Sequence, residues 1–177
     1  MMETERILLR HWCDGDTEAL FKYASDPDVG SRAGWPPHKS VEESGEIIRT
    51  VFNNDTTWAI ELKATGEAIG AIGYGPSCDC NLPARDGEPI AGYWIAKPYW
   101  NQGICTEALR LMIDYIRITT DIPSLISGHF IDNPASGRVM EKCGFIPTGE
   151  TCVDESQYMG KDRPIRVLRL ELITKNT

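Results

Sequence analysis

The segment PYWNQGICTEALR (residues 98–110) decides how the rest of the chain is interpreted. It begins with a proline and two aromatic residues, narrows to the polar turn NQG, and then takes up a helical pattern. A glycine at such a junction lets a ligand approach the backbone closely. The first turn of a helix also presents unpaired N–H groups that suit an anion. The segment therefore indicates either an anion site or an ordinary tight turn, and the surrounding sequence has to decide between them.

The composition is that of a globular protein with one core. The chain has 177 residues, of which 41% are hydrophobic and 25% are charged, and this length suits one domain over residues 1–177. No apolar run approaches the roughly 18 residues of a membrane span. The start, MMETERILLR, lacks the basic-then-apolar plan of a secretory signal. We therefore expect a cytoplasmic protein without a membrane partner.

The charge balance bears on the kind of partner. The formal net charge is −8 and the sequence pI is about 4.9, with no basic cluster. Such a chain is poorly suited to bind the phosphate backbone of a nucleic acid, so no nucleic-acid partner is expected. Negative potential near a cleft is compatible with a cationic substrate.

The six cysteines form no pattern that indicates a metal or a disulfide framework. No Cys-x-x-Cys pair occurs, and only three histidines are present. Cys78 and Cys80 could touch a metal, but their spacing differs from that of the usual zinc pairs. We expect incidental thiols in a reducing compartment and no bound metal.

Hydrophobic periodicity predicts one mixed α/β domain with the element order β α α β β β α β α β β. Strands are expected at residues 6–12, 57–62, 68–75, 89–96, 124–131, 144–150 and 166–172. Helices are expected at residues 17–24, 41–52, 104–116 and 133–143, with residues 25–40 as a loop rich in proline and glycine. Because a helix joins them, the strands at 89–96 and 124–131 should be parallel, whereas residues 57–96 should form an antiparallel meander.

A second polar stretch follows the later of the two parallel strands. In DNPASGRVMEKCGF (residues 132–145), Asn133 can cap a helix, Pro134 suits its first position and Gly144 suits its exit. The carboxyl ends of parallel strands meet at a ligand crevice, so Asn133 and Ser136 should face the same crevice as Gly103. Taken singly, Asn133 could be only a cap, and Ser136 could only solvate the first turn.

Together, YWNQGICTEAL and NPASGRVMEKCGF resemble the motifs of the Gcn5-related N-acetyltransferases (GNAT). RILLRHW, GWPPHKSVEES and GYWIAKPYW are similar to the RimJ/RimL-like ribosomal-protein branch of that superfamily. The resemblance spans nearly the whole chain. It implies a mixed, mostly antiparallel sheet with a splayed central parallel pair flanked by helices. It also implies acetyl-CoA as co-substrate and a primary amine as acceptor.

The resemblance implies a set of cofactor-binding residues. The family carries an Arg/Gln-x-x-Gly-x-Gly/Ala loop for the pyrophosphate, and here Trp100 takes the first place and Cys105 the last. Backbone groups of residues 94–96 would pair with the pantetheine arm like an added strand, which requires a splay, typically with a bulge, and leaves an N–H for the thioester carbonyl. The implied contacts are Trp94, Ile95, Ala96, Trp100, Asn101, Gln102, Gly103, Ile104, Cys105, Thr106, Asn133 and Ser136.

The resemblance also implies catalytic residues. The family branch places a hydroxyl near the leaving sulfur, and here that position is Ser136, with Asn133 beside it. Direct attack in a ternary complex is favoured over an acyl-cysteine, because Cys105 lies at the phosphate loop and Cys143 near the end of the short helix. An alkylamine has a pKa near 10.4, so a base must accept its proton, directly or through water.

The base is left open by the sequence. The candidates are a water chain or one of four carboxylates, Asp86, Glu88, Glu107 and Glu155. Trp35, His38 and Tyr93 could wall the acceptor pocket, although aromatics on a sheet are commonly core and a loop histidine is commonly solvated. His129 is expected to be a strand residue satisfied by a neighbour.

Three functions are compatible with the sequence. The first is an N-acetyltransferase acting on a protein N-terminal α-amine, a polyamine or an amine-bearing small molecule. The second is a non-catalytic domain that binds or senses acyl-CoA. The third is an interaction module that kept the fold and lost the cofactor, which the replacements at Trp100 and Cys105 favour. A homodimer is compatible with each of them.

Overall fold

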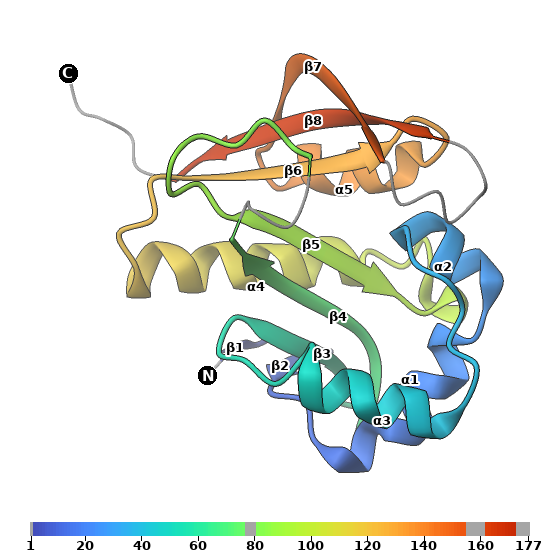
Figure 1. Cartoon of the computed structure of the whole chain (residues 1–177). Helices are drawn as coiled ribbons and strands as arrows, with labels where there is room; N and C mark the ends of the chain where they lie inside the picture. The colour runs from blue at the N-terminus through green and yellow to red at the C-terminus, as the bar shows by residue number, and fades with distance from the viewer. Residues whose placement is uncertain (1, 77–80, 155–161, 173–177) are drawn as a thin grey trace.

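The computed structural model describes residues 2–76, 81–154 and 162–172, and its centre is an eight-stranded mixed sheet (Figure 1). The strands are β1 (Met2–Glu3), β2 (Ile7–Arg10), β3 (Thr57–Leu62), β4 (Glu67–Gly75), β5 (Ile90–Ile95), β6 (Ser124–Phe130), β7 (Ile146–Asp154) and β8 (Arg163–Glu171). Their order in the sheet is β1-β2-β3-β4-β5-β6-β8-β7. The helices are α1 (Thr17–Ala24), α2 (Pro27–Ala33), α3 (Val41–Thr50), α4 (Ile104–Thr119) and α5 (Pro134–Lys142). In the described ranges, no helix combines the length and the apolar character needed to cross a bilayer.

The predicted fold class is confirmed, and so is the parallel pair. β5 and β6 are parallel, whereas every other pair of neighbouring strands is antiparallel. Helices cover both faces of the sheet. Trp58 and Ile60 pack in the cluster that contains the buried side of α4, and Ala59 between them packs with α1 and α3. Strand alternation thus divides the core into two layers, one on each face.

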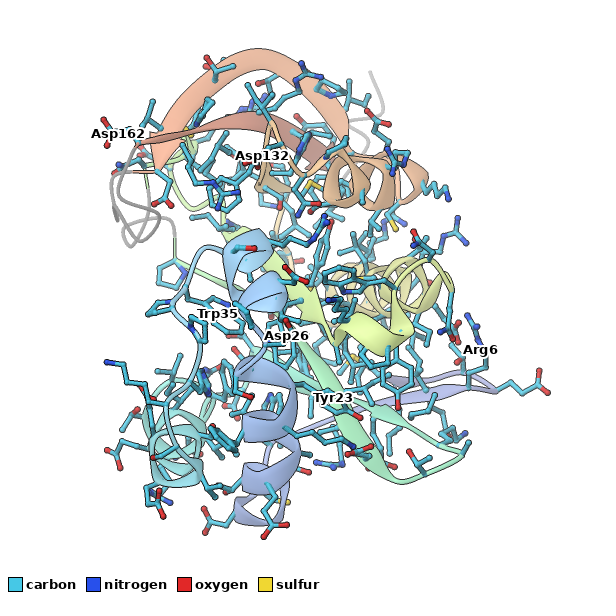
Figure 2. The ribbon with its side chains drawn as sticks, turned by 90° about the vertical axis from the view of Figure 1, so that its right-hand side faces the viewer. Arg6, Tyr23, Asp26, Trp35, Asp132 and Asp162 are labelled. Carbon is cyan, nitrogen blue, oxygen red and sulfur yellow. The ribbon has the colours of Figure 1, made fainter. Side chains whose placement is uncertain are left out.

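The predicted loop at residues 25–40 was wrong, because it contains α2. Asp26 caps this helix by accepting a hydrogen bond from the Asp28 amide, and Pro27 occupies its first turn. Gly34 ends it in the left-handed conformation with φ of 90°. Each of these is a local start or stop signal. In Figure 2, α2 lies between α1 and the segment that carries Asp132.

Element ends differ from the prediction in a few places. α3 ends at Thr50, which leaves Val51 57% exposed, and Phe52 stacks instead on Trp12 with ring centroids 5.0 Å apart. β7 and β8 extend further toward the 154–163 connection than expected, and β1 was not predicted. The expected face of α4 is confirmed, since Ala108, Leu109, Met112, Ile113 and Ile116 are all buried.

β5 and β6 separate step by step along their length. At their start, the Ile126 amide donates to the Pro89 carbonyl at 3.1 Å, and the described ladder has the single position Ile90–Ile126. One step on, the Ser127 hydroxyl bridges the wider gap to the Ala91 carbonyl at 2.7 Å. Beyond this bridge the described residues of the two strands make no further ladder pair, so the predicted splay is confirmed.

The pairing of β4 with β5 decides which backbone groups face this gap. The Ala96 amide donates to the Ile69 carbonyl, so by the alternation of an antiparallel ladder Trp94 also points its backbone groups at β4. Tyr93 and Ile95 therefore present theirs to the gap, which corrects the expectation for Trp94 and Ala96. The expected bulge near Trp94 is also absent from the described β4–β5 register, which runs without a shift, and a register shift falls instead after Ile60 in β3.

A buried carboxylate fixes the closed end of the gap. Glu88, only 1% exposed, precedes β5 and accepts hydrogen bonds from Ser124 Oγ at 2.7 Å and Arg169 Nε at 2.8 Å. It also accepts from the Arg85 amide at 3.0 Å. Burial acts to raise the pKa of Glu88, but these donors outweigh it and lower the pKa below its usual value. This carboxylate ties the starts of β5 and β6 to β8.

We expect Glu88→Ala to lower the free energy of unfolding by about 3–5 kcal/mol, because it leaves the largely covered Arg169 without its counter-ion. Glu171→Ala is the control, since Glu171 pairs with Arg85 on the exposed surface and should cost less than about 1 kcal/mol. Urea unfolding measures both values. The pKa of Glu88 is lowered in the folded protein. The contribution of this carboxylate to the free energy of unfolding is therefore full above about pH 4.3 and is lost as the pH falls further. A stability difference between wild type and Glu88→Ala that persists at low pH would contradict this assignment.

Candidate active site

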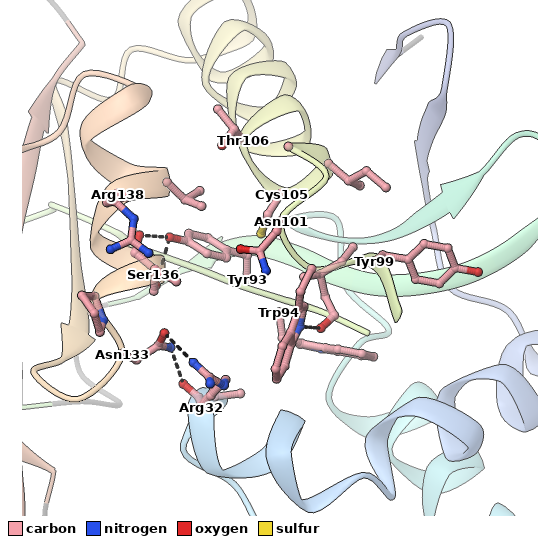
Figure 3. Close-up of a pocket in the computed structure, with 18 of the residues that line it drawn as sticks. Arg32, Tyr93, Trp94, Tyr99, Asn101, Cys105, Thr106, Asn133, Ser136 and Arg138 are labelled. Carbon is pink, nitrogen blue, oxygen red and sulfur yellow. Dashed lines mark hydrogen bonds between the residues drawn. The ribbon is translucent and has the colours of Figure 1, made fainter. Parts of the chain in front are cut away.

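A cleft of about 580 Å³ opens at the carboxyl ends of β5 and β6. Four segments line it: α2, the end of β5, residues 99–106, and residues 132–142 from the start of α5. Figure 3 shows side chains from these segments converging on one space. Ligand sites of α/β sheets lie at such strand ends, where neighbouring connections diverge. The cleft therefore brings together the two polar stretches that the sequence singled out.

The start of α4 is shaped to expose backbone amides. Asn101 and Gly103 have positive φ values of 60° and 77°, and the Glu107 amide is bonded to the Gly103 carbonyl at 3.0 Å. The amides before Glu107 have no carbonyl four residues earlier within the helix. Together with the positive end of the helix dipole, they form an anion-binding surface at the cleft.

The loop before α4 is braced from the side away from the cleft. Arg6 donates from Nη1 to the Gln102 carbonyl at 3.1 Å and from Nε to the Glu107 carboxylate at 2.9 Å. Thr4 donates to the other oxygen of Glu107. Glu107 is thus held by the N-terminal segment and does not line the cleft, so the structure gives it a structural place among the four candidate carboxylates.

Trp100 fastens the loop to β5. Its indole Nε1 donates to the Ile95 carbonyl at 2.8 Å, and the Arg32 guanidinium lies over its ring at 4.6 Å from the centroid. The Trp100 indole therefore already bonds to the Ile95 carbonyl, which is one of the backbone groups that face the gap. It also gives Arg32 an aromatic platform, a contact that stabilises a cation.

Three cations at the cleft were missed by the sequence interpretation. Arg32, Arg138 and Lys142 all line it. Arg32 was missed because α2 was taken for a loop. Arg138 and Lys142 are one helical turn apart, a spacing that any solvated helix face shows, so the sequence carried no distinguishing signal. Their charges add to the anion-binding character of the α4 start.

Ser136 is tied to Tyr93 across the cleft. The Tyr93 hydroxyl donates to the Ser136 carbonyl at 2.8 Å and lies 3.0 Å from Ser136 Oγ (Figure 3). Burial raises the pKa of Tyr93 well above its usual value, so the phenol keeps its proton. Since that single proton is used on the carbonyl, the contact with Oγ requires the serine to donate to the phenol oxygen. Tyr93 thus fixes both the start of α5 and the serine hydroxyl.

Asn133 does not cap α5 with its side chain, contrary to the expectation. Asn133 is 8% exposed and its carboxamide faces Arg32, with Oδ1 3.4 Å from Arg32 Nη1 and Nδ2 3.4 Å from the Arg32 carbonyl. Pro134 takes the first turn and Gly144 follows the exit with φ of 93°, as predicted. Asn133 therefore joins α2 to the start of α5 across the cleft.

The structure brings most of the predicted site residues to the cleft. Those that line it are Tyr93, Trp94, Ile95, Trp100, Asn101, Gly103, Ile104, Cys105, Thr106, Asn133 and Ser136. Ala96 is fully buried, and the Gln102 side chain donates to the Pro98 carbonyl at 2.9 Å, so neither of them reaches the cleft. Their roles as ligands of a cofactor stay predictions.

Trp35 and His38 lie outside the cleft lining. Trp35 packs edge-on against Trp94 at 5.8 Å between ring centroids, and His38 packs on Trp35 at 5.4 Å. His38 Nδ1 is 2.8 Å from the Ser44 hydroxyl, and burial lowers the pKa of His38. Both residues support the wall behind Trp94.

The cysteines near the cleft are poor nucleophiles. Burial raises the pKa of Cys105 to about 12. Burial also raises the pKa of Cys143, whose thiol is 3.5 Å from the Thr106 carbonyl. Because the thiolate is the reactive form, these surroundings disfavour an acyl-cysteine. Across the described part of the chain, no three His, Cys, Asp or Glu side chains gather as a metal site requires, while Cys78, Cys80 and the candidate base Glu155 fall outside it.

A smaller pocket of about 200 Å³ continues from the cleft into the gap between β5 and β6. We call it the slot pocket. It shares Arg32, Ala33, Tyr93 and Ser136 with the cleft. Its other lining residues are Ala91, Gly92, Ser127, Gly128, His129, Phe130, Met140 and Ile165. A ligand in the slot pocket would therefore meet a ligand in the cleft beside Tyr93 and Ser136.

Comparisons with known proteins agree with this geometry. The family model described as "Acetyltransferase (GNAT) domain" matches residues 6–146. The chain is 29% identical over 154 residues to the "Uncharacterized N-acetyltransferase YoaA" of Bacillus subtilis, covering 84% of each chain. A GNAT-family acetyltransferase structure from Bacillus anthracis superposes with a TM-score of 0.79 at 18% identity, covering 96% of this chain and 97% of that one. Spermidine N-acetyltransferase of Vibrio cholerae, solved with CoA and spermine, gives 0.75 at 16% identity over the same shares.

We expect Gly103→Val to weaken the binding of inorganic pyrophosphate at least tenfold, or about 1.4 kcal/mol. A β-branched residue is strained at a φ of 77°, so it should distort the turn that exposes the amides. Gly66→Val is the matched control, because Gly66 has a φ of 70°, has open space around it and lies in the turn between β3 and β4. Calorimetric titration gives both affinities, and equal weakening in the two variants would contradict an anion site at the start of α4.

Proposed function

Because this chain belongs to the acetyltransferase (GNAT) family, we propose that it transfers an acetyl group from acetyl-CoA to a primary amine. The observation that carries the proposal is the junction of an anion-binding helix start with a splayed strand pair. The Vibrio cholerae spermidine N-acetyltransferase, which shares the fold, was solved with CoA. The residues that line the cleft here are also suited to CoA. They offer complementary groups to its diphosphate, to its extended amide-bearing arm and to a thioester at the end of that arm.

The diphosphate would be held by the amides of residues 101–106. Arg32, Arg138 and Lys142 supply positive charge around that position. The gap-facing carbonyl of Tyr93 and the amide of Ile95 remain for an extended amide chain, since the Trp100 indole already bonds to the Ile95 carbonyl. This arrangement directs the far end of the ligand toward Ser136.

Bound acetyl-CoA supplies the acetyl group as a thioester with a leaving thiolate. The Tyr93 amide N–H, which faces the gap, is suited to stabilise negative charge on the carbonyl oxygen. The Ser136 hydroxyl lies beside Tyr93, and turning its proton from the phenol oxygen to the thiolate would stabilise the leaving group by a hydrogen bond. The raised pKa values of Cys105 and Cys143 support direct attack by the amine over a covalent cysteine route.

The slot pocket favours an acceptor with a single ammonium group. Arg32 is the one charged side chain among the described residues that line it. A polyamine held there would bury further ammonium groups without a carboxylate partner, which costs free energy. A peptide N-terminus or a small molecule with one amine fits these surroundings better, and the RimJ/RimL-like motifs support the peptide.

Thiol release tests the proposal directly. Acetyl-CoA is incubated with a panel of peptides, small monoamines and polyamines, and free CoA is measured over time. We expect turnover with at least one monoamine and weak or no turnover with polyamines. Calorimetry with CoA separates the rival functions. CoA binding without thiol release on any amine would favour a sensing domain, and the lack of CoA binding would favour an interaction module.

We expect Ser136→Ala to lower kcat about tenfold to a hundredfold while the Kd for CoA stays within about twofold. This range corresponds to the roughly 1.5–3 kcal/mol of one hydrogen bond to a charged group. Ser31→Ala is the control, because the Ser31 hydroxyl donates to the Asp28 carbonyl within α2 and does not line the cleft. A kcat that is unchanged in Ser136→Ala would remove this hydroxyl from the chemistry.

A further inference from the structure

His129 and Tyr93 face each other across the gap between the two splayed strands. The Tyr93 hydroxyl donates to the Ser136 carbonyl, and the His129 ring lies against Gly137. Both contacts are with α5, so both side chains lie on the α5 side of the sheet. Both residues line the slot pocket together with Ser136.

One nitrogen of His129 has a defined role. Its Nδ1 is 2.8 Å from the Phe130 carbonyl, and a carbonyl can only accept, so Nδ1 carries a proton. In the neutral ring this leaves a lone pair on Nε2. Within the described part of the chain, Nε2 has no hydrogen-bond partner. The sequence interpretation, in which His129 is satisfied by a neighbour, therefore accounts for only one side of the ring.

Gly137 shows where the Nε2 edge of the ring lies. A Cβ added at Gly137 would be 2.6 Å from His129 Nε2, far inside van der Waals contact. The imidazole therefore occupies the space of a side chain in the first half of α5, directly after Ser136. Glycine inside a helix is destabilising relative to alanine, and the room that it makes for this ring accounts for its presence.

We propose that His129 Nε2 accepts the proton of the acceptor amine, which enters through the slot pocket. This inference rests on the proposed acetyl transfer. The amine nitrogen attacks the thioester carbon, a C–N bond forms, and the C–S bond breaks with its electron pair on sulfur. The N–H proton moves to Nε2, directly or through one water, and the imidazolium then returns it to the thiolate to give the free thiol.

The other bases are placed less well. The Glu88 carboxylate is occupied at the closed end of the gap and Glu107 is held behind α4. The charged or titratable side chains that line the slot pocket with His129 are Tyr93 from β5 and Arg32 from α2, and Arg166 is the ladder partner of His129 on β8. α5 presents Ser136 and Gly137 there. None of these is a carboxylate, so the described surroundings leave Nε2 as the free basic atom of the slot pocket.

Replacing His129 by glutamine tests the inference. We expect kcat at neutral pH to fall about a hundredfold or more, the usual contribution of a general base, with the Kd for CoA within about twofold. The decline of kcat toward acid pH that protonation of the base produces in the wild type should flatten in His129→Gln. His11→Gln, which changes an exposed histidine outside both pockets, should retain the wild-type rate.

A second variant keeps the imidazole and moves it. In Gly137→Ala, the new methyl group must displace the ring, so kcat should fall although alanine is the better helix former. The double variant should be no slower than His129→Gln alone, since both changes act on one group. A His129→Gln rate within threefold of an active wild type would overturn the role of His129 and leave the proposed function standing. A wild type without thiol release on any amine would overturn the proposed function itself.

Discussion

A buried carboxylate at the start of β5 is the constraint on which the site depends. Glu88 joins β5 to β6 through Ser124 and to β8 through Arg169, so the two parallel strands are fixed together at one end. From this fixed end the hydrogen bonds between β5 and β6 become fewer. The Ile126 amide still reaches the Pro89 carbonyl, whereas at Ala91 the carbonyl is reached by the Ser127 side chain. Two strands held at one end only can diverge without losing their register. The gap that results exposes backbone groups which a regular sheet would consume.

The walls of the gap are positioned by contacts from distant parts of the sequence. Arg6 bonds to the loop before α4 from outside, and Trp100, which lies in the loop, bonds to the end of β5. On the opposite wall, Arg163 is 7% exposed and donates to the Ser31 carbonyl at 2.5 Å and to the Asp132 carboxylate at 2.8 Å. Its guanidinium also lies 3.6 Å from the centroid of the Phe130 ring. α2 is therefore held to the β6 end by a buried cation, which keeps the cleft open to a defined width.

The sequence predicted what local patterns encode. Alternation gave the strands of the meander, and the glycine before α4 indicated the turn that exposes amides. It did not predict contacts between residues far apart in the chain. Asn133 reads locally as a helix cap, and only the fold brings it to Arg32, 101 positions away. In the same way, Gly137 reads as a weak point in a helix until the His129 ring is seen beside it. Local rules fail at these positions because the site uses the residues for other contacts.

Net charge and local charge diverge in this protein. The chain carries a formal charge of −8, which favours a cationic acceptor, yet the cleft gathers Arg32, Arg138 and Lys142 around a helix start. Surface charges separated by more than about 8–10 Å are largely screened at physiological ionic strength, so the carboxylates elsewhere act little on this site. The cations and exposed amides instead select an anion for the cleft, while the slot pocket has a single arginine and a free imidazole nitrogen. The charges that line the two pockets are therefore a better guide to the ligand than the net charge of the chain.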